Sequence, residues 1–251
     1  MRLLVDLGNT RLKWMLADGT AVRGRSVSLA WDEADFEARL EALLAVVPPV
    51  VSIWIASVAG PAREARVCEA LRRRFGIEPR MAVAASELCG IRLAYREPER
   101  MGIDRVLALV AVQASGYAPC VLAGLGTALT LDALASNGQH LGGLIVAGPE
   151  LMQKALVDAA GRVTIRREGR VGWFADNTDD AIAGGSWLAT AALVERFYEE
   201  SAKTLGLVPR LILTGGAAPR LQPLLRIAAI EMPDGVLRGL AILAQRPTQK
   251  A

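Results

Sequence analysis

The feature that most constrains the fold of this chain is a short pattern that occurs twice. Leu7-Gly8-Asn9-Thr10 and Leu125-Gly126-Thr127 each lie at the turn between two strand-like apolar segments, and a third strand and then helices follow. Gly8 and Gly126 are separated by close to half of the 251 residues. The pattern predicts an internal duplication, with two α/β lobes facing each other across a cleft.

The spacing of apolar residues predicts the elements of each half. In the first half we expect strands at residues 3–7, 12–16, 21–29, 50–58 and near 81–83, with helices at 32–47, 62–75 and 101–115. In the second half we expect strands at 120–123, 129–135, 141–146 and 211–214, with helices at 149–160, at 179–205 and from about 236. We therefore place the first lobe at residues 1–116 and the second at 117–251.

Composition excludes several classes of protein. Hydrophobic residues make up 52% of the chain, which rules out intrinsic disorder. The net charge of +3 is too small to indicate nucleic-acid binding, although a pI of about 9.0 suits anionic small ligands. A nucleic-acid interface would also need aromatic platforms, and the segment that holds Arg162, Arg166, Arg167 and Arg170 contains no aromatic residue.

The cysteines and the long apolar stretches bear on the cellular location of the protein. The three cysteines have no metal-type spacing and, being odd in number, suggest no disulfide framework. Two uncharged stretches, 43–60 and 106–131, are long enough to span a membrane, but prolines and glycines interrupt both. We interpret each as a buried helix followed by a buried strand. Asp6 interrupts the first apolar stretch, so no signal peptide is expected and a cytoplasmic location is favoured.

The first hairpin contains the most informative group of polar residues. Gly8 permits a tight turn, and Asn9 and Thr10 can present amide hydrogens and a hydroxyl to phosphate oxygens. Asp6 can hold Mg²⁺ through water, and Lys13 supplies a positive charge for a phosphate. The alternative is an ordinary hairpin with a solvent-facing lysine. A carboxylate within an apolar strand disfavours that alternative, because an unpaired buried carboxylate is costly.

Other candidate residues are more ambiguous. Gly215 and Gly216 follow a strand and permit either close approach of a nucleotide base or an ordinary connection to a helix. Asp104 precedes an apolar helical run, so it is either the helix N-cap or a catalytic base. The same ambiguity applies to Asn177-Thr178-Asp179-Asp180 at the start of the long helix. His140 is the only histidine, which excludes histidine-based triads and metal clusters.

Taken together, these motifs resemble the type III pantothenate kinase family of the acetate and sugar kinase/actin superfamily. The resemblance runs in family order from residue 6 to 216. The matching residues are Asp6-Leu7-Gly8-Asn9-Thr10 with Lys13; Tyr95; Gly102-Ile103-Asp104-Arg105; Gly126-Thr127-Ala128 with Thr130 and Asp132; Leu141-Gly142-Gly143 with Gly148; Asn177-Thr178 with Ala181-Ile182 and Gly184; and Leu213-Thr214-Gly215-Gly216. The resemblance implies two ribonuclease-H-like (actin-like ATPase) lobes, each a mixed sheet flanked by helices.

The same resemblance implies ATP-dependent phosphorylation of pantothenate at its terminal hydroxyl, the first step of coenzyme A synthesis. It implies that Asp104 is the proton acceptor and that the enzyme is a homodimer. Pantothenate would be bound by Tyr95, Gly102, Ile103, Asp104, Arg105 and, from the partner subunit, Thr178. ATP with Mg²⁺ would be bound by Asp6, Leu7, Gly8, Asn9, Thr10, Arg11, Leu12, Lys13, Thr127, Gly215 and Gly216. Arg105 would either pair with the pantothenate carboxylate or steady Asp104.

The chain departs from the family pattern at one position. The family usually has an acid two residues before the second Gly-Thr, where K⁺ or NH₄⁺ binds, and this chain has Gly124. Either cation activation is lost, or Asp132, carbonyl groups and water supply the ligands. The rival functions are another small-molecule kinase of the superfamily, acting on sugars or acetate, and a nucleotide-binding regulatory protein without turnover.

Overall fold

The computed structural model describes residues 1–161 and 163–246, which form two compact units. The first comprises Met1–Ser115 together with the chain from Asp234 onward, and the second comprises Gly116–Pro233. The sequence-based boundaries place the last helix in the second lobe, and in this respect the structure differs from them.

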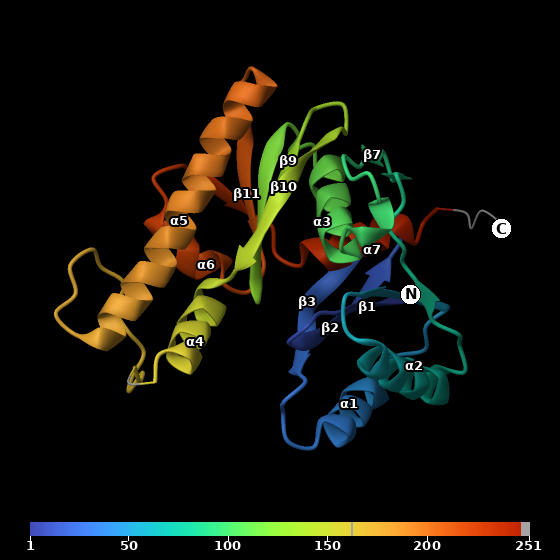
Figure 1. The fold of residues 1–251 in the computed structure, drawn as a ribbon. Coiled ribbons are helices and arrows are strands. Elements are labelled where there is room, and N and C mark those ends of the chain that lie inside the picture. The colour runs from blue at the N-terminus through green and yellow to red at the C-terminus, as the bar shows by residue number, and fades with distance from the viewer. Residues whose placement is uncertain (162, 247–251) are drawn as a thin grey trace. The chain divides into compact units, whose positions relative to one another are not determined.

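The first unit is built on a five-stranded mixed sheet (Figure 1). Its order is β3-β2-β1-β4-β5, in which β1, β2 and β3 are antiparallel neighbours, while β4 and β5 run parallel to β1. The turn residues at Gly8 and Gly19 allow the direct hairpins, whereas the parallel strands need crossover helices. The strands are β1 (Arg2–Leu7), β2 (Arg11–Asp18), β3 (Ala21–Ala30), β4 (Ser52–Ser57) and β5 (Arg80–Met81).

Helices flank the first sheet: α1 (Phe36–Ala45), α2 (Pro61–Phe75), α3 (Ile103–Ala114) and α7 (Gly235–Leu243). Leu3, Val5 and Leu7 of β1 share a core with α1 and α2. Since side chains alternate along a strand, Asp6 lies on the opposite face, where α7 contacts β1. The short elements that the sequence did not predict here are β6 (Glu87–Leu88), β7 (Ile91–Arg92) and the 3₁₀ turn η1 (Pro98–Arg100).

The second unit repeats the topology of the first, with sheet order β10-β9-β8-β11-β12. Again the first three strands are antiparallel and the last two are parallel to the first. This correspondence confirms the duplication expected from the two turns. The elements are β8 (Cys120–Leu125), β9 (Ala128–Leu134), β10 (His140–Ala147), α4 (Pro149–Ala159), α5 (Thr178–Leu205), β11 (Arg210–Thr214), α6 (Ala218–Leu221), η2 (Gln222–Leu224) and β12 (Ala229–Glu231).

The last helix belongs to the first unit because its packing partner is α3. Figure 1 shows the two helices side by side, and a Cβ placed on Gly239 of α7 would lie 1.9 Å from the backbone oxygen of Leu107 in α3. Only glycine permits this contact. α7 also contacts β1, β2, β3 and β4, so it covers the face of the first sheet that carries Asp6.

The two uncharged stretches are divided between elements. Residues 43–60 include the end of α1 and all of β4, and residues 106–131 include most of α3, the whole of β8 and the start of β9. Among the residues that the structure describes, no helix combines the length and hydropathy needed to cross a bilayer.

Candidate active site

Asp6 lies near the end of β1 among three other charged residues of the first unit. Lys13 on β2 is its direct cross-strand neighbour. Burial raises the pKa of Asp6 from 3.8 to about 7; the negative charges of Asp104 and Asp234 also raise it, and Lys13 opposes them. Asp6 and Asp104 are therefore close enough to interact, as a shared site requires. Lys13 itself is partly exposed beside Asp6.

The turn after β1 closes between Gly8 and Arg11. The Gly8 N–H donates to the Arg11 carbonyl at 3.1 Å, and Asn9 and Thr10 lie exposed between them. Leu7 and Leu12 pair at the strand ends and are buried in the core. The core thus anchors the turn, while its tip remains accessible to a ligand.

The start of α3 brings Asp104 to this site without making it a cap. The N-cap is Gly102, so Asp104 is the second helical residue, and its Oδ1 accepts from the backbone N–H of Arg105 at 2.8 Å. The N-cap alternative for Asp104 is therefore wrong. A carboxylate in the first turn is favoured by the helix dipole.

Arg105 is 5% exposed, and its guanidinium donates to the Tyr95 hydroxyl at 2.8 Å. The same guanidinium lies 5.7 Å from the centre of the Tyr95 ring. The structure thus brings together two residues that the resemblance assigns to the substrate, Tyr95 from the segment after β7 and Arg105 from α3. Ile103, beside them in the first turn of α3, is buried.

In the second unit, the turn between β8 and β9 lies against two glycines distant in sequence. The Gly148 N–H donates to the Thr127 carbonyl at 2.9 Å. Gly215 has φ +98°, and a Cβ on it would lie 2.2 Å from the Leu125 oxygen, so only glycine fits there. Gly216 has open space instead. Thr127 and Gly215 therefore converge, as expected of two parts of one binding site.

At Gly124, where the family usually has the acid that binds a monovalent cation, the Thr130 side chain occupies the space that a side chain would need. Gly124 lies in β8 between Thr130 of β9 and Thr214 of β11, and a Cβ on it would approach Thr130 Oγ1 to 2.5 Å. Asp132, the substitute ligand considered above, is 1% exposed, and its Oδ1 lies 2.9 Å from His140 Nε2. Its carboxylate is thus already paired with a buried imidazole.

Thr178 is exposed and is the first residue of α5. It directly follows the N-cap Asn177, whose side chain forms a capping hydrogen bond. The Asn177 side chain accepts from the Asp180 N–H at 3.0 Å. A side-chain hydrogen bond from Arg167, with others from Asn177 and the Arg170 backbone, holds the pKa of Asp180 below its ordinary value. Arg167 is thus engaged with an acid, which disfavours it as a phosphate contact for nucleic acid; Arg162, of the same cluster, lies outside the described residues.

Motif reasoning missed three residues near the first turn. Asp234, the N-cap of α7, acts on Asp6 and accepts a hydrogen bond from Ser26 at 2.7 Å. Trp31 and Arg63 bond to carbonyl groups of the turn itself. A turn signal, Pro233-Asp234-Gly235, is visible in the sequence, but nothing in it indicates proximity to residue 6.

A metal ion at this site would find few protein ligands. Within the described residues, no group of three or more His, Cys, Asp or Glu side chains is arranged to hold one. The partly buried Asp6 carboxylate nevertheless suits a divalent cation, because a positive charge would offset the desolvation that raises its pKa. Mg²⁺ commonly binds through one or two carboxylates and keeps several waters, so the residues present fit it.

Comparisons with known proteins agree with this geometry. The family model for type III pantothenate kinase matches residues 2–200. A type III pantothenate kinase of Xanthomonas campestris pv. campestris (strain B100) is 42% identical over 241 residues, covering 96% of each chain, and one of Nitrosospira multiformis is 37% identical over 250 residues, covering 99% of this chain and 93% of its own. A Baf family protein of Campylobacter jejuni shares the fold, with a TM-score of 0.59, 18% identity and 97% coverage of both chains. The chain therefore belongs to the type III pantothenate kinase family.

Proposed function

We propose that this protein transfers the γ-phosphoryl group of ATP to the terminal hydroxyl of pantothenate, giving 4′-phosphopantothenate in the first step of coenzyme A synthesis. The observation that carries the proposal is the placement of Asp6, Lys13 and Asp104 within interaction distance in a chain of this family. Phosphoryl transfer depends chiefly on positioning and charge stabilisation, so a phosphate turn beside a carboxylate is the minimum that it requires.

In this mechanism Asp104 accepts the proton of the pantothenate hydroxyl as the oxygen attacks phosphorus. Its location in the first turn of α3 places the carboxylate where the helix dipole favours a negative charge. Tyr95, Gly102, Ile103 and Arg105 bind pantothenate. The pairing of Tyr95 with Arg105 places this guanidinium beside another residue assigned to the substrate, which supports a role for it in recognising the anionic end of pantothenate.

ATP is held by the first turn and its strands, Asp6 to Lys13, and by Thr127, Gly215 and Gly216. Asn9 and Thr10 donate backbone hydrogens to phosphate oxygens, and Lys13 contributes a point charge. Mg²⁺ would neutralise part of the phosphate charge, and Asp6 is the residue that would hold it, through water. Because Thr130 occupies the space beside Gly124, we propose that turnover needs no bound K⁺.

The test is pantothenate-dependent release of ADP by the purified protein. We expect turnover with pantothenate and none with glucose, N-acetylmannosamine or acetate. Turnover with one of those three in place of pantothenate would assign the chain to another kinase activity, and binding of ATP without turnover on any of them would support the regulatory alternative.

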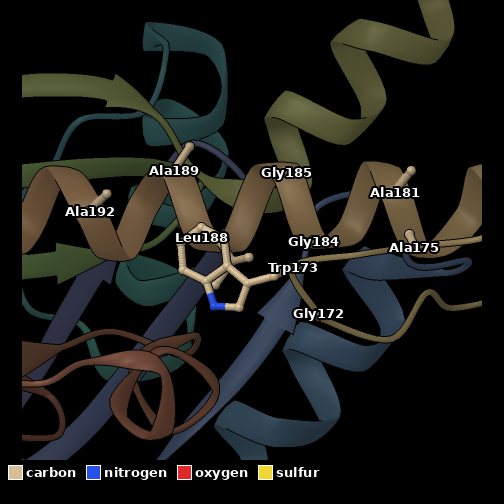
Figure 2. A pocket seen from close by; sticks show the side chains of 9 residues that line it. All are labelled: Gly172, Trp173, Ala175, Ala181, Gly184, Gly185, Leu188, Ala189 and Ala192. Atoms are coloured by element: carbon tan, nitrogen blue, oxygen red, sulfur yellow. The ribbon is translucent and has the colours of Figure 1, made fainter.

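We further propose that the active form is a homodimer in the cytoplasm, joined through an apolar face of the second unit. On α5 a stripe of small residues faces outward, and with Gly172 and Trp173 it lines a groove of about 440 Å³ (Figure 2). Next to this groove the Phe174 side chain is 100% exposed and that of Trp173 70%. A groove beside a protruding ring is self-complementary, as a two-fold interface requires.

The dimer also accounts for Thr178, which directly follows this surface and would reach the partner's substrate. Replacing Phe174 by Asp should shift the protein from dimer to monomer in sedimentation equilibrium and lower activity together with it. Replacing Phe197, a partly buried residue of α5 that packs against the core of the second unit, by Leu is the control and should leave the protein dimeric. A monomeric wild-type protein with full activity would contradict this proposal.

A further inference from the structure

Two side chains outside the family motifs hold the carbonyl groups of the phosphate turn, defined as residues Gly8 to Arg11. The indole Nε1–H of Trp31 donates to the Gly8 carbonyl at 2.9 Å, and the Arg63 guanidinium donates to the Asn9 carbonyl at 2.6 Å. The backbone N–H of Trp31 also donates to the Thr10 carbonyl at 3.1 Å. Three successive carbonyl groups of the turn are thus drawn toward Trp31 and Arg63.

Peptide geometry converts these bonds into an orientation of the amides. In a planar trans peptide the C=O and the N–H point in opposite directions. Fixing the Gly8 carbonyl therefore directs the Asn9 N–H away from Trp31, and fixing the Asn9 carbonyl directs the Thr10 N–H away from Arg63. These are the two amides to which the proposed function assigns phosphate oxygens. Successive amides aimed to one side form an anion-binding nest.

The two donors also hold each other. The Arg63 guanidinium lies 5.1 Å from the centre of the Trp31 ring, and that ring contacts Phe36 in a tilted arrangement, with 5.0 Å between centroids. Trp31 packs against the first core, and Arg63 lies in the first turn of α2. We call Trp31 and Arg63 the clamp. The clamp connects the turn to the end of β3 and to the start of α2, two elements that contain none of the motif residues.

We propose that Trp31 and Arg63 are positioning residues that preorganise the phosphate turn for the ATP phosphates. This inference rests on the proposed function, because it takes the turn as the ATP phosphate site. Without the clamp, the two peptide units rotate more freely, and ATP must order them as it binds. The loss then falls on ATP binding rather than on pantothenate binding.

The test measures the KM of MgATP and the KM of pantothenate for Trp31→Phe and Arg63→Met in the full chain. Trp31→Phe keeps an aromatic ring for Phe36 and removes the indole donor. Each variant should raise the KM of MgATP about tenfold and change the KM of pantothenate less than about twofold, since the hydrogen bond that each variant removes is worth about that factor. Arg63→Lys, which keeps a donor and a charge, should recover part of the loss.

Arg66→Met is the matched control, because Arg66 lies one turn along α2, where its guanidinium is 5.3 Å from the centre of the Phe36 ring and pairs with Glu37. It has the same type of ring contact but does not touch the turn, so its KM values should match the wild type. Lys13→Ala serves as the reference for the site. If Lys13→Ala raises the KM of MgATP while Trp31→Phe and Arg63→Met behave like Arg66→Met, the proposed clamp is refuted and the assigned phosphate site is retained. If Lys13→Ala also leaves that KM unchanged, both the clamp and the assigned phosphate site are refuted.

Discussion

The partly buried, desolvated carboxylate of Asp6 should make the ligand-free protein less stable as the pH rises. The folded protein holds a proton on Asp6 with a pKa of about 7, whereas an unperturbed aspartate has a pKa of 3.8. The folded state therefore binds this proton more tightly than the unfolded state. The resulting stabilisation is fully present below pH 3.8 and is lost as the pH rises to about 7.

The difference of about 3 pH units sets the size of the effect. At about 1.4 kcal/mol for each unit, ionising Asp6 in the folded protein costs at most about 4 kcal/mol above pH 7. Asp6→Asn has no charge to desolvate or to repel Asp104 and Asp234. We expect the variant to be more stable than the wild type by about 2 to 4 kcal/mol at pH 8.5, and by less than about 1 kcal/mol at pH 4.5.

Urea unfolding in the presence of EDTA, without nucleotide, measures this difference at a series of pH values. Asp18→Asn is the matched control, because Asp18 is 62% exposed at the other end of the same hairpin, and its pH profile should follow the wild type. Adding Mg²⁺ at pH 8.5 should stabilise the wild type and not Asp6→Asn. An equal stability difference between wild type and Asp6→Asn at pH 4.5 and pH 8.5 would refute the assignment of a desolvated carboxylate to Asp6.

Three further outcomes are expected. Asp104→Asn should lower kcat by a factor of about 10² to 10⁴ while ATP binding, measured calorimetrically, is retained; full activity would remove Asp104 as the proton acceptor. Replacing K⁺ by a bulky organic cation should change turnover less than about twofold, because Gly124 supplies no carboxylate; a large drop would show that a cation site exists. Gly215→Ala should lower the free energy of unfolding by about 2 kcal/mol or more through its contact with Leu125 and its positive φ. Gly216→Ala, where a Cβ has open space, should change that free energy by less than about 0.5 kcal/mol, and equal effects of the two would contradict the assigned backbone path.

The two hairpins were accessible from sequence because their signals are local. The apolar run at residues 3–7, the alternation along 12–16 and the intervening Gly8 predict a hairpin, and the similar turn around Gly126 predicts its duplicate. The role of Asp104 was not accessible in this way. An aspartate directly before the first helical residue is an N-cap, whereas an aspartate at the second helical residue is a carboxylate of the first turn. The difference depends on where α3 starts, and the helix starts at Ile103.

The remaining site residues could not be predicted because they meet only in the folded chain. Asp234 is 228 positions from Asp6, and its effect on the Asp6 pKa comes from the packing of α7 on the first sheet. Trp31 and Arg63 bond to carbonyl oxygens, which every residue possesses, so no side-chain motif at the turn marks them. Likewise, the lobe to which the last helix belongs is decided by the close approach of Gly239 to α3, and the spacing of apolar residues does not show which sheet a helix will cover.

The packing of α7 also has a consequence for synthesis on the ribosome. The strands of the first sheet emerge early, but the helix that covers the Asp6 face is made only after residues 116–233 have been translated. The unit that is begun first is therefore the last to be completed, and a nascent chain halted before Gly235 exposes one side of that sheet. Any ribosome-bound or truncated form ending there would present this apolar surface to chaperones and proteases.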